Sequence, residues 1–386
     1  MNKNKLLSFV LIVIIYLISA GASYILFSGT KTVTKVVAPK VGTSGKLTFD
    51  ETLPKTEACP MNGALYSKQQ KEWWEKHRPL GIMVENHQEA RPQSGLSSAD
   101  VIYEAVAEGG ITRFLTIFYC NSAEQVGPIR SARTYFLDFI SEYGANPLYV
   151  HVGGANTDGP ADALSQIEDY GWAGLNDINQ FSVGFPTFWR DYDRLGHTAA
   201  TEHTMYSTTE KLLQFAATSR KLGVKNEDGV PWTKNFVEYG FKDDAAVSER
   251  PASQTIHLEF WKGYSDYAID WIYDPSSNIY KRNNGGAAHI DRNNNQQLTA
   301  KSIIVLSMIE SSADDGYENN LHLLYKTKGT GKATIFMDGK KIVGTWRKDS
   351  RTARMLLFDS AGSSIKLDRG TIWFEILPTD GIMTVK

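Results

Sequence analysis

Two arginines three positions apart are the strongest candidates for binding chemistry. Arg130 and Arg133 lie in the segment GPIRSAR at 127–133, directly before residues 134–143, whose apolar positions have helical spacing. Ser131 is the expected N-cap of this helix. The unpaired N–H groups and the dipole at a helix start favour an anion, and guanidinium groups form charge-assisted bonds to carboxylates. The segment therefore predicts a site for an anionic or carboxylate-bearing ligand.

A second group of charges belongs to a predicted β-hairpin. Two β-rich runs flank the Gly-Gly pair at 109–110, which is a strong turn signal. A two-residue turn there places Val106 opposite Arg113, and alternation along the strands then puts Glu104, Glu108 and Arg113 on one face. Two interpretations stay open: a binding site that uses these charges, and a surface ion cluster worth only ~0–1 kcal/mol.

Polar residues also stand at the ends of predicted strands. His151 lies near the end of an apolar strand at 147–152, before a flexible Gly pair and Asn156. Because α/β folds place functional groups at strand ends, these are candidate ligand-binding residues. A histidine satisfied inside the core is the competing interpretation. We expect one cleft to be lined by Glu104, Arg113, Arg130, Arg133 and His151.

An aromatic stretch follows at 170–192, where seven of 23 residues are aromatic and Asn, Gln and Asp are interleaved with them. Flat rings and amides suit a sugar or peptide surface. A long loop that packs on its own rings has the same composition, so both interpretations remain.

Catalytic and metal sites have weaker support. A hydrolase needs a nucleophile–base pair, for which Ser131 and His151 are the obvious candidates, but no nucleophile-elbow sequence surrounds Ser131. Phosphate-loop and dinucleotide fingerprints are absent from the sequence. We assign no catalytic residue, no metal and no cofactor, and keep a hydrolase acting on an envelope polymer as an alternative. Metal ligands without a recognised spacing would be His151, His197, His203, or His289 with Asp291.

Composition and charge exclude some classes of protein and divide the chain into a basic start and an acidic remainder. The 386 residues include 42% apolar residues, 41 Lys+Arg against 43 Asp+Glu, and two cysteines. The cysteine count excludes a disulfide-dense scaffold, and the net charge of −2 gives no reason to expect a nucleic-acid partner. That charge is unevenly distributed: residues 1–49 carry six lysines and no acid, so the remaining 337 residues carry −8.

The basic start contains an apolar run, Leu6–Phe27, of 22 uncharged residues. As a helix it is ~33 Å long, enough to cross a hydrocarbon core of ~30 Å. A cleaved signal peptide is the alternative, since Ala20-Gly21-Ala22 has the form of a peptidase site. Because the apolar run continues past it, we expect an uncleaved, single-pass signal anchor with the N-terminus cytoplasmic and the bulk extracytoplasmic.

These features divide the chain into four segments. Residues 1–28 are a cytoplasmic tip and transmembrane anchor, and 29–77 a stalk with a short helix. Residues 78–225 are an α/β (α+β) domain with a mixed sheet and flanking helices, and 231–386 a mostly antiparallel β domain. In an oxidising compartment Cys59 and Cys120 could pair and tie the stalk to the first domain, or remain unpaired.

The chain resembles the YerB-like lipoprotein family, which is built from the N- and C-terminal domains of unknown function 3048. The resemblance covers residues 78–380 and implies an exported, membrane-attached protein of two domains, with no established reaction. It adds Asn86 as a ligand-binding candidate, and His289 and Asp291 as second-domain candidates. The chain departs from a lipoprotein because no cysteine closely follows the apolar run. The segments that carry the resemblance include RPLGIMVENHQEARPQSGLSSADVIYEAVAEGGITRF (78–114), VGPIRSAR (126–133), YVHVGG (149–154), AHID (288–291), DGKKIVGTWRK (338–348) and TIWFEILP (371–378).

The function expected from these features is a membrane-tethered extracytoplasmic binding protein, attached to the membrane through Leu6–Phe27. Its ligand is an anionic or carboxylate-bearing envelope glycan or peptide. The alternative is an envelope scaffold that recruits protein partners through edges of the β-rich domain.

Overall fold

The structure, a computed structural model, describes residues 2–3, 7, 11, 13–19, 39–41 and 47–386. The chain forms two compact units, Met1–Val37 and Ala38–Lys386. In the first unit residues 13–19 are helical. Among the residues described, no helix has both the length and the hydropathy needed to span a membrane. Much of the predicted anchor, Leu6–Phe27, lies outside the described residues.

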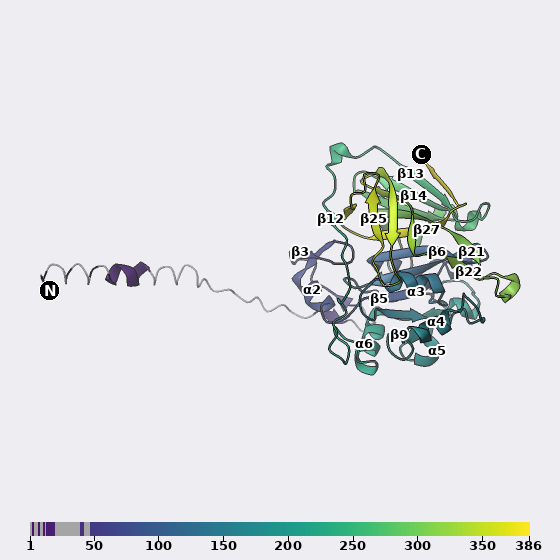
Figure 1. Ribbon diagram of the computed structural model, residues 1–386, viewed down its shortest axis with the longest axis horizontal. Helices are drawn as coiled ribbons and strands as arrows, with labels where there is room; N and C mark the ends of the chain where they lie inside the picture. The colour runs from purple at the N-terminus through teal and green to yellow at the C-terminus, as the bar shows by residue number, and fades with distance from the viewer. Residues whose placement is uncertain (1, 4–6, 8–10, 12, 20–38, 42–46) are drawn as a thin grey trace. The chain divides into compact units, whose positions relative to one another are not determined.

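The second unit is built on a ten-stranded mixed sheet (Figure 1). Five of its strands come from the N-terminal half and five from the C-terminal half, and the two sets meet where β27 pairs with β6. In spatial order the strands are β25 (Leu356–Asp359), β24 (Lys340–Lys348), β23 (Gly329–Met337), β20 (Ser302–Met308), β27 (Ile372–Pro378), β6 (Val101–Glu108), β7 (Ile111–Phe118), β5 (Leu80–Glu85), β8 (Leu148–His151) and β9 (Asp177–Asn179).

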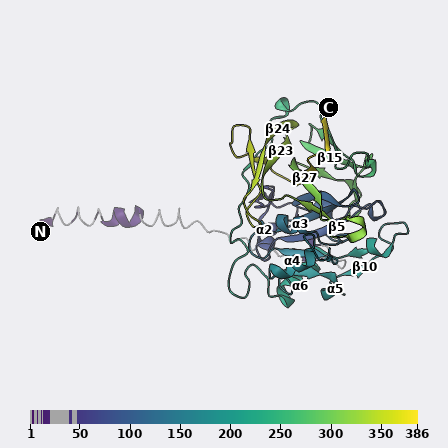
Figure 2. The same cartoon turned by 45° about the vertical axis from the view of Figure 1, so that its right-hand side comes forward.

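Different layers cover the two faces of this sheet. On one face Phe139 of α3 (Thr134–Ile140) stacks on Tyr103 of β6. On the other face Trp271, from a six-stranded antiparallel sheet, packs against Trp373 of β27. Figure 2 shows the helices and the smaller sheet on opposite sides of β5 and β27. The smaller sheet contains β13 (Thr255–Glu259), β14 (Ile269–Asp274), β15 (Ile279–Asn284), β16 (Ala287–Ala288), β19 (Thr299–Ala300) and β28 (Ile382–Val385).

Shorter elements complete the unit. The remaining helices are α2 (Lys68–Trp74), α4 (Ala163–Asp169), α5 (Gln180–Val183) and α6 (Thr209–Ser219), with 3-10 turns η1 (Gln88–Ala90), η2 (Leu96–Ser98), η3 (Thr201–His203), η4 (Val247–Glu249), η5 (Ser265–Tyr267) and η6 (Tyr317–Asn319). The remaining strands form pairs: β1 (Lys40–Val41) with β2 (Leu47–Thr48), β3 (Lys55–Ala58) with β4 (Leu65–Ser67), β10 (Trp189–Arg190) with β11 (Met205–Tyr206), β12 (Phe241–Lys242) with β26 (Leu367–Asp368), β17 (Ile290–Asp291) with β18 (Gln296–Gln297), and β21 (Glu310–Ser312) with β22 (Leu323–Tyr325).

The predicted fold class is confirmed in outline: the N-terminal half is mixed α/β and the C-terminal half mostly antiparallel β. The two halves nevertheless share one sheet. Strand β27 runs parallel to β6 and pairs Glu375 with Glu104 and Phe374 with Tyr103. Segments 78–225 and 231–386 are therefore joined by backbone pairing as well as by the chain between them.

The hairpin of β6 and β7 has the predicted turn but a different register. Glu108 lies opposite Ile111 as expected, but a bulge between Val106 and Glu108 then shifts the pairing, so Val106 lies opposite Thr112. Because one extra residue moves all later side chains to the other face, Arg113 shares a face with Glu108 while Glu104 points to the opposite side. The prediction that all three charges lie on one face is therefore wrong.

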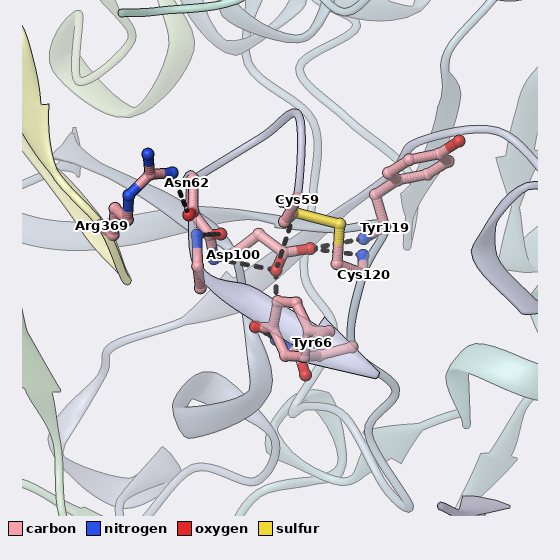
Figure 3. The surroundings of a disulfide bond; sticks show 10 residues. Cys59, Asn62, Tyr66, Asp100, Tyr119, Cys120 and Arg369 are labelled. Atoms are coloured by element: carbon pink, nitrogen blue, oxygen red, sulfur yellow. Dashed lines mark hydrogen bonds between the residues drawn. A yellow bond between two sulfur atoms is a disulfide. The ribbon is translucent and has the colours of Figure 1, made fainter. Parts of the chain in front are cut away.

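The segment before residue 78 is partly integrated into the folded unit. The short helix predicted there is α2, which β4 precedes and which Ser67 begins with a capping box to Gln70. Trp74 of this helix is buried. Nearby, Cys59 and Cys120 form a disulfide that joins this segment to the end of β7 (Figure 3).

A buried carboxylate lies beside the disulfide. Asp100 accepts hydrogen bonds from the backbone N–H groups of Tyr119 (2.7 Å) and Cys120 (2.8 Å), and from the amides of Asn62 (3.0 Å) and Asn121 (3.1 Å). Burial raises the pKa of Asp100 from 3.8 to about 7, although these hydrogen bonds act in the opposite direction.

This shift predicts a pH dependence of stability. The folded state keeps the Asp100 proton up to pH about 7, while the unfolded chain releases it near 3.8. The contribution of Asp100 to the unfolding free energy is therefore full below pH about 4 and decreases as the pH rises through about 7. Urea denaturation across this window should show a flatter profile for Asp100→Asn than for the wild type. Parallel profiles would contradict the assignment.

Candidate functional site

Three arginines from two segments line one depression on the α3 side of the large sheet. Arg113 comes from β7, while Arg130 and Arg133 come from the loop before α3. We call this depression, of about 400 Å³, the arginine pocket. Its lining residues are Glu108, Gly109, Ile111, Arg113, Arg130, Ser131, Arg133, Tyr317, Glu318 and Leu321.

The floor of the arginine pocket is formed by two buried guanidinium groups that share one carboxylate. Glu108 contacts Arg113 at 3.3 Å and also pairs with Arg133. The side chains of Arg113 and Arg133 are only 4% and 7% exposed, and burial lowers the pKa of both. Their Nε atoms find no acceptor among the described residues. Two cations with unused Nε donors therefore share the partly exposed Glu108, and Arg113 also lies opposite Glu85 in the β5–β7 pairing.

Arg130 is the most exposed of the three arginines and has its own partner. Its Nε lies 3.1 Å from Glu85, whose other oxygen accepts a hydrogen bond from Nδ1 of His203 at 2.7 Å. Burial opposes ionisation of Glu85, but the bond from His203 and the charges of Arg130 and Arg113 outweigh it and lower its pKa. The same hydrogen bond raises the pKa of His203. Arg130 and His203 are thus held by one ionised carboxylate.

A second depression adjoins the first through shared residues. It has a volume of about 380 Å³, and Arg130 and Ser131 line both. Arg190 and the exposed ring of Phe181 belong to its lining, together with Gly153. Together the two depressions are lined by four arginines, with Phe181 in the lining of one and Tyr317 in the lining of the other.

His151 supports this region from below. It is fully buried, with Nδ1 2.6 Å from the carbonyl oxygen of Gly153 and Nε2 2.5 Å from Asp177. The carbonyl of Gly153 also accepts the backbone N–H of Ala132. His151 therefore fixes the loop of Gly153 and Gly154 against the segment that carries Arg130 and Arg133. Asn156 is exposed and does not belong to the lining of either depression.

The remaining candidates lie on the opposite face, between the two sheets. Glu104 accepts hydrogen bonds from Thr112 and Asn86, and pairs with the buried Arg282 of β15. Arg282 in turn donates to Nδ1 of His289. Burial lowers the pKa of His289 well below its usual value, so its Nε2–H donates to Gln93 at 2.7 Å.

Asp291 also joins the two halves. Its carboxylate accepts the backbone N–H groups of Gly95 (3.0 Å) and Ser97 (2.7 Å) from the N-terminal half. Asn86, Glu104, His289 and Asp291 are all buried, and their polar atoms are used by one another and by neighbouring strands. In this structure they hold the sheets together and do not line the arginine pocket.

Several local expectations change as a result. The expectation of one cleft is wrong for Glu104, which the bulge turns away, and for His151, which is buried beneath the loop. Ser131 is not the N-cap, because α3 begins after Arg133 and has no side-chain cap. Since α3 has seven residues, its dipole adds little to the site.

Sequence reasoning missed Glu85 and Arg282. Glu85 lies directly opposite Arg113 in the β5–β7 pairing, so its position could have been found from the register of these strands. Arg282 approaches Glu104 across 178 residues of sequence, and no local pattern indicates that contact. From the sequence, His203 is a candidate metal ligand only.

The aromatic stretch at 170–192 contains both buried and exposed rings. Phe185 is 84% exposed, whereas Trp172 and Phe188 are buried, so some rings pack the loop and others remain available.

His151 contacts Gly153 and Asp177 with its ring nitrogens rather than Ser131. The nucleophile–base pair that the hydrolase alternative needs is therefore not formed by these two residues.

Comparison with known proteins finds two family domains that match this chain. Residues 65–223 match the model for the N-terminal domain of proteins of unknown function DUF3048, and residues 256–374 match its C-terminal domain. The chain is 28% identical over 305 residues to "Putative lipoprotein YerB" of Bacillus subtilis (strain 168), which covers 78% of this chain and 82% of that protein.

A solved structure agrees at the level of the fold. The crystal structure of YerB protein from Bacillus subtilis superposes with a TM-score of 0.67 at 23% identity, covering 86% of this chain and 100% of that one. Together the two domain matches span most of the folded unit. The chain belongs to the DUF3048 family of proteins of unknown function and carries both of its domains.

Proposed function

We propose that this protein is a membrane-tethered extracytoplasmic binding protein whose arginine pocket holds a carboxylate-bearing envelope glycan or peptide. The observation that carries the proposal is the convergence of Arg113, Arg130 and Arg133 in the lining of that one pocket. Guanidinium groups form strong, charge-assisted hydrogen bonds with carboxylates, so three arginines in one lining suit a ligand that carries this group.

The shape of the region favours an elongated ligand. Because Arg130 lines both depressions, one anionic group can bind Arg130 and Arg133 while the adjoining part extends toward Arg190 and Phe181. A flat ring beside cationic groups suits a sugar or peptide that carries carboxylates.

The location rests on separate support. Leu6–Phe27 is uncharged, has the length of a membrane span and is flanked by lysines. The disulfide of Cys59 with Cys120 suits an oxidising compartment outside the cytoplasm. A relative is named a lipoprotein. Here both cysteines are in the disulfide, so we propose attachment through the apolar segment rather than through a lipidated cysteine.

Muropeptides, which combine free carboxylates with a glycan, provide the test. They should stabilise the wild-type protein against heat, and Arg130→Ala should weaken their binding by tenfold or more, because it removes charge-assisted hydrogen bonds. Isothermal titration calorimetry measures the affinity. Arg130 is preferred over Arg133 because it is 28% exposed and can be replaced without opening the core.

The matched control is Arg347→Ala, which removes an exposed arginine of β24 that pairs with Asp349. This variant should bind muropeptides like the wild type. Muropeptides with amidated carboxylates should bind neither the wild type nor the Arg347→Ala variant. Equal affinity of Arg130→Ala and the wild type, or no binding to the wild type, would refute the proposal.

A further inference from the structure

Two histidines and a glutamate come together on the surface beside Glu85. Ligand atoms of His87, Glu89 and His203 all lie within 4.8 Å of one another. Nε2 of His203 is 3.6 Å from the carboxylate of Glu89. The rings of His87 and His203 stack in parallel, with centroids 4.8 Å apart. Two imidazoles and one carboxylate form a donor set that divalent transition metals prefer.

The buried member of this set is oriented by a second carboxylate. Nδ1 of His203 donates to Glu85 at 2.7 Å, which leaves Nε2 directed toward Glu89. Metal-binding histidines characteristically donate their other ring N–H to a carboxylate in this way, because the bond fixes the ring and raises its basicity. Glu85 is itself fixed by Arg130, so the orientation of His203 is fixed from two sides.

The other two ligands can adjust. His87 is half-buried and Glu89 is exposed, so rotation of their side chains can shorten the separations to those of a metal site. Nδ1 of His87 accepts the backbone N–H of Glu89 at 3.2 Å, and this long bond would be exchanged when the ring turns to a cation. Three protein ligands leave a coordination position open for water or a ligand atom.

Two other clusters of described residues bring together three potential ligands, but both are already satisfied. In the cluster of Cys59, Asp100 and Cys120 the sulfur atoms are bonded to each other. In the cluster of Asp244, Asp338 and Asp368, Lys242 already pairs with two of the carboxylates.

We propose that His87, Glu89 and His203 bind a divalent transition-metal ion such as Zn²⁺, with Glu85 as the outer partner that links this site to Arg130. The site goes beyond the proposed ligand binding and does not depend on it. Glu85 contacts both Arg130 and His203, so the bound metal ion would lie close to Arg130, which lines both depressions. An anionic group bound there could also reach the open coordination position of the metal ion.

The test titrates the full chain, purified in detergent, with Zn²⁺ alone. Isothermal titration calorimetry should find one Zn²⁺ per chain, and Co²⁺ should give the absorption bands of a protein-bound ion. His87→Ala and Glu89→Gln should each weaken Zn²⁺ binding by tenfold or more. Both positions are on the surface, so these variants keep the test valid even if a change at the buried His203 prevents folding.

His197→Ala is the matched control. It removes an exposed histidine whose ring contacts only backbone oxygens of Thr198 and Arg91 among the described residues. This variant should bind Zn²⁺ like the wild type. Absence of Zn²⁺ binding by the wild type, or equal binding by the His87→Ala/Glu89→Gln double variant, would overturn the metal site. Neither result affects muropeptide binding by Arg130, which is measured without added metal.

Discussion

Glu142→Gln should lower the free energy of unfolding by about 3–5 kcal/mol, because it breaks a buried ion cluster while keeping the side chain's shape. Glu142 is fully buried and contacts Lys348 at 3.1 Å and Arg354 at 2.8 Å. It also accepts bonds from the hydroxyl of Tyr103 (2.6 Å) and the backbone N–H of Met355 (2.8 Å).

The size of the effect follows from what remains after the substitution. Burial opposes ionisation of Glu142, but the charges of Lys348 and Arg354 outweigh it and keep its pKa low. With a neutral amide in its place, two buried cations lose their anion. The cluster joins the end of α3 to β24, so its loss weakens the contact between the two halves.

Urea denaturation followed by tryptophan fluorescence measures this change. The matched control is Asp349→Asn, which removes an exposed carboxylate paired with Arg347 one residue beyond β24. Exposed pairs contribute at most about 1 kcal/mol, so this variant should unfold almost like the wild type. Similar midpoints for the two variants would show that Glu142 is not the centre of a stabilising cluster.

Replacing Cys59 and Cys120 together by alanine should cost about 4 kcal/mol. The two cysteines are 61 residues apart in sequence, and a cross-link over that distance restricts the unfolded chain strongly. Both side chains are buried, so the bond also fixes the segment before α2 against the end of β7.

Thermal melting of the double variant, compared with the wild type before and after reduction under denaturing conditions, measures the contribution. The reduced wild type should melt near the double variant, since both lack the same constraint. A double variant that melts with the oxidised wild type would mean that the surrounding contacts of Asp100 and Asn62 hold the segment without the bond.

The sequence predicts local elements of the site better than their combination. The Gly-Gly turn and the strands around it are encoded within a few residues, and period-two alternation indicates which side chains of a strand share a face. The bulge before Glu108 has no such signal, because Ala107 fits a regular strand as well as a bulged one. That single residue decides whether Glu104 shares a face with Arg113.

Contacts between distant segments are the second feature of the site that the sequence does not reveal. The prediction that Arg130 and Arg133 share a site with Arg113 needed only a loop and a neighbouring strand. The burial of Glu104 and His289 depends on Arg282, which a different sheet supplies. Periodicity describes one element at a time, so it cannot reveal which charge from another sheet will neutralise a buried one.

The pairing of β27 with β6 has a consequence for how the chain reaches this state. Until residues 372–378 have been made, β6 presents an unpaired edge in the middle of the future sheet. Such an edge can pair with other chains, and pairing across a long sequence separation is slow. The two sequence domains thus form one folding unit, and an N-terminal half produced alone would expose an aggregation-prone strand.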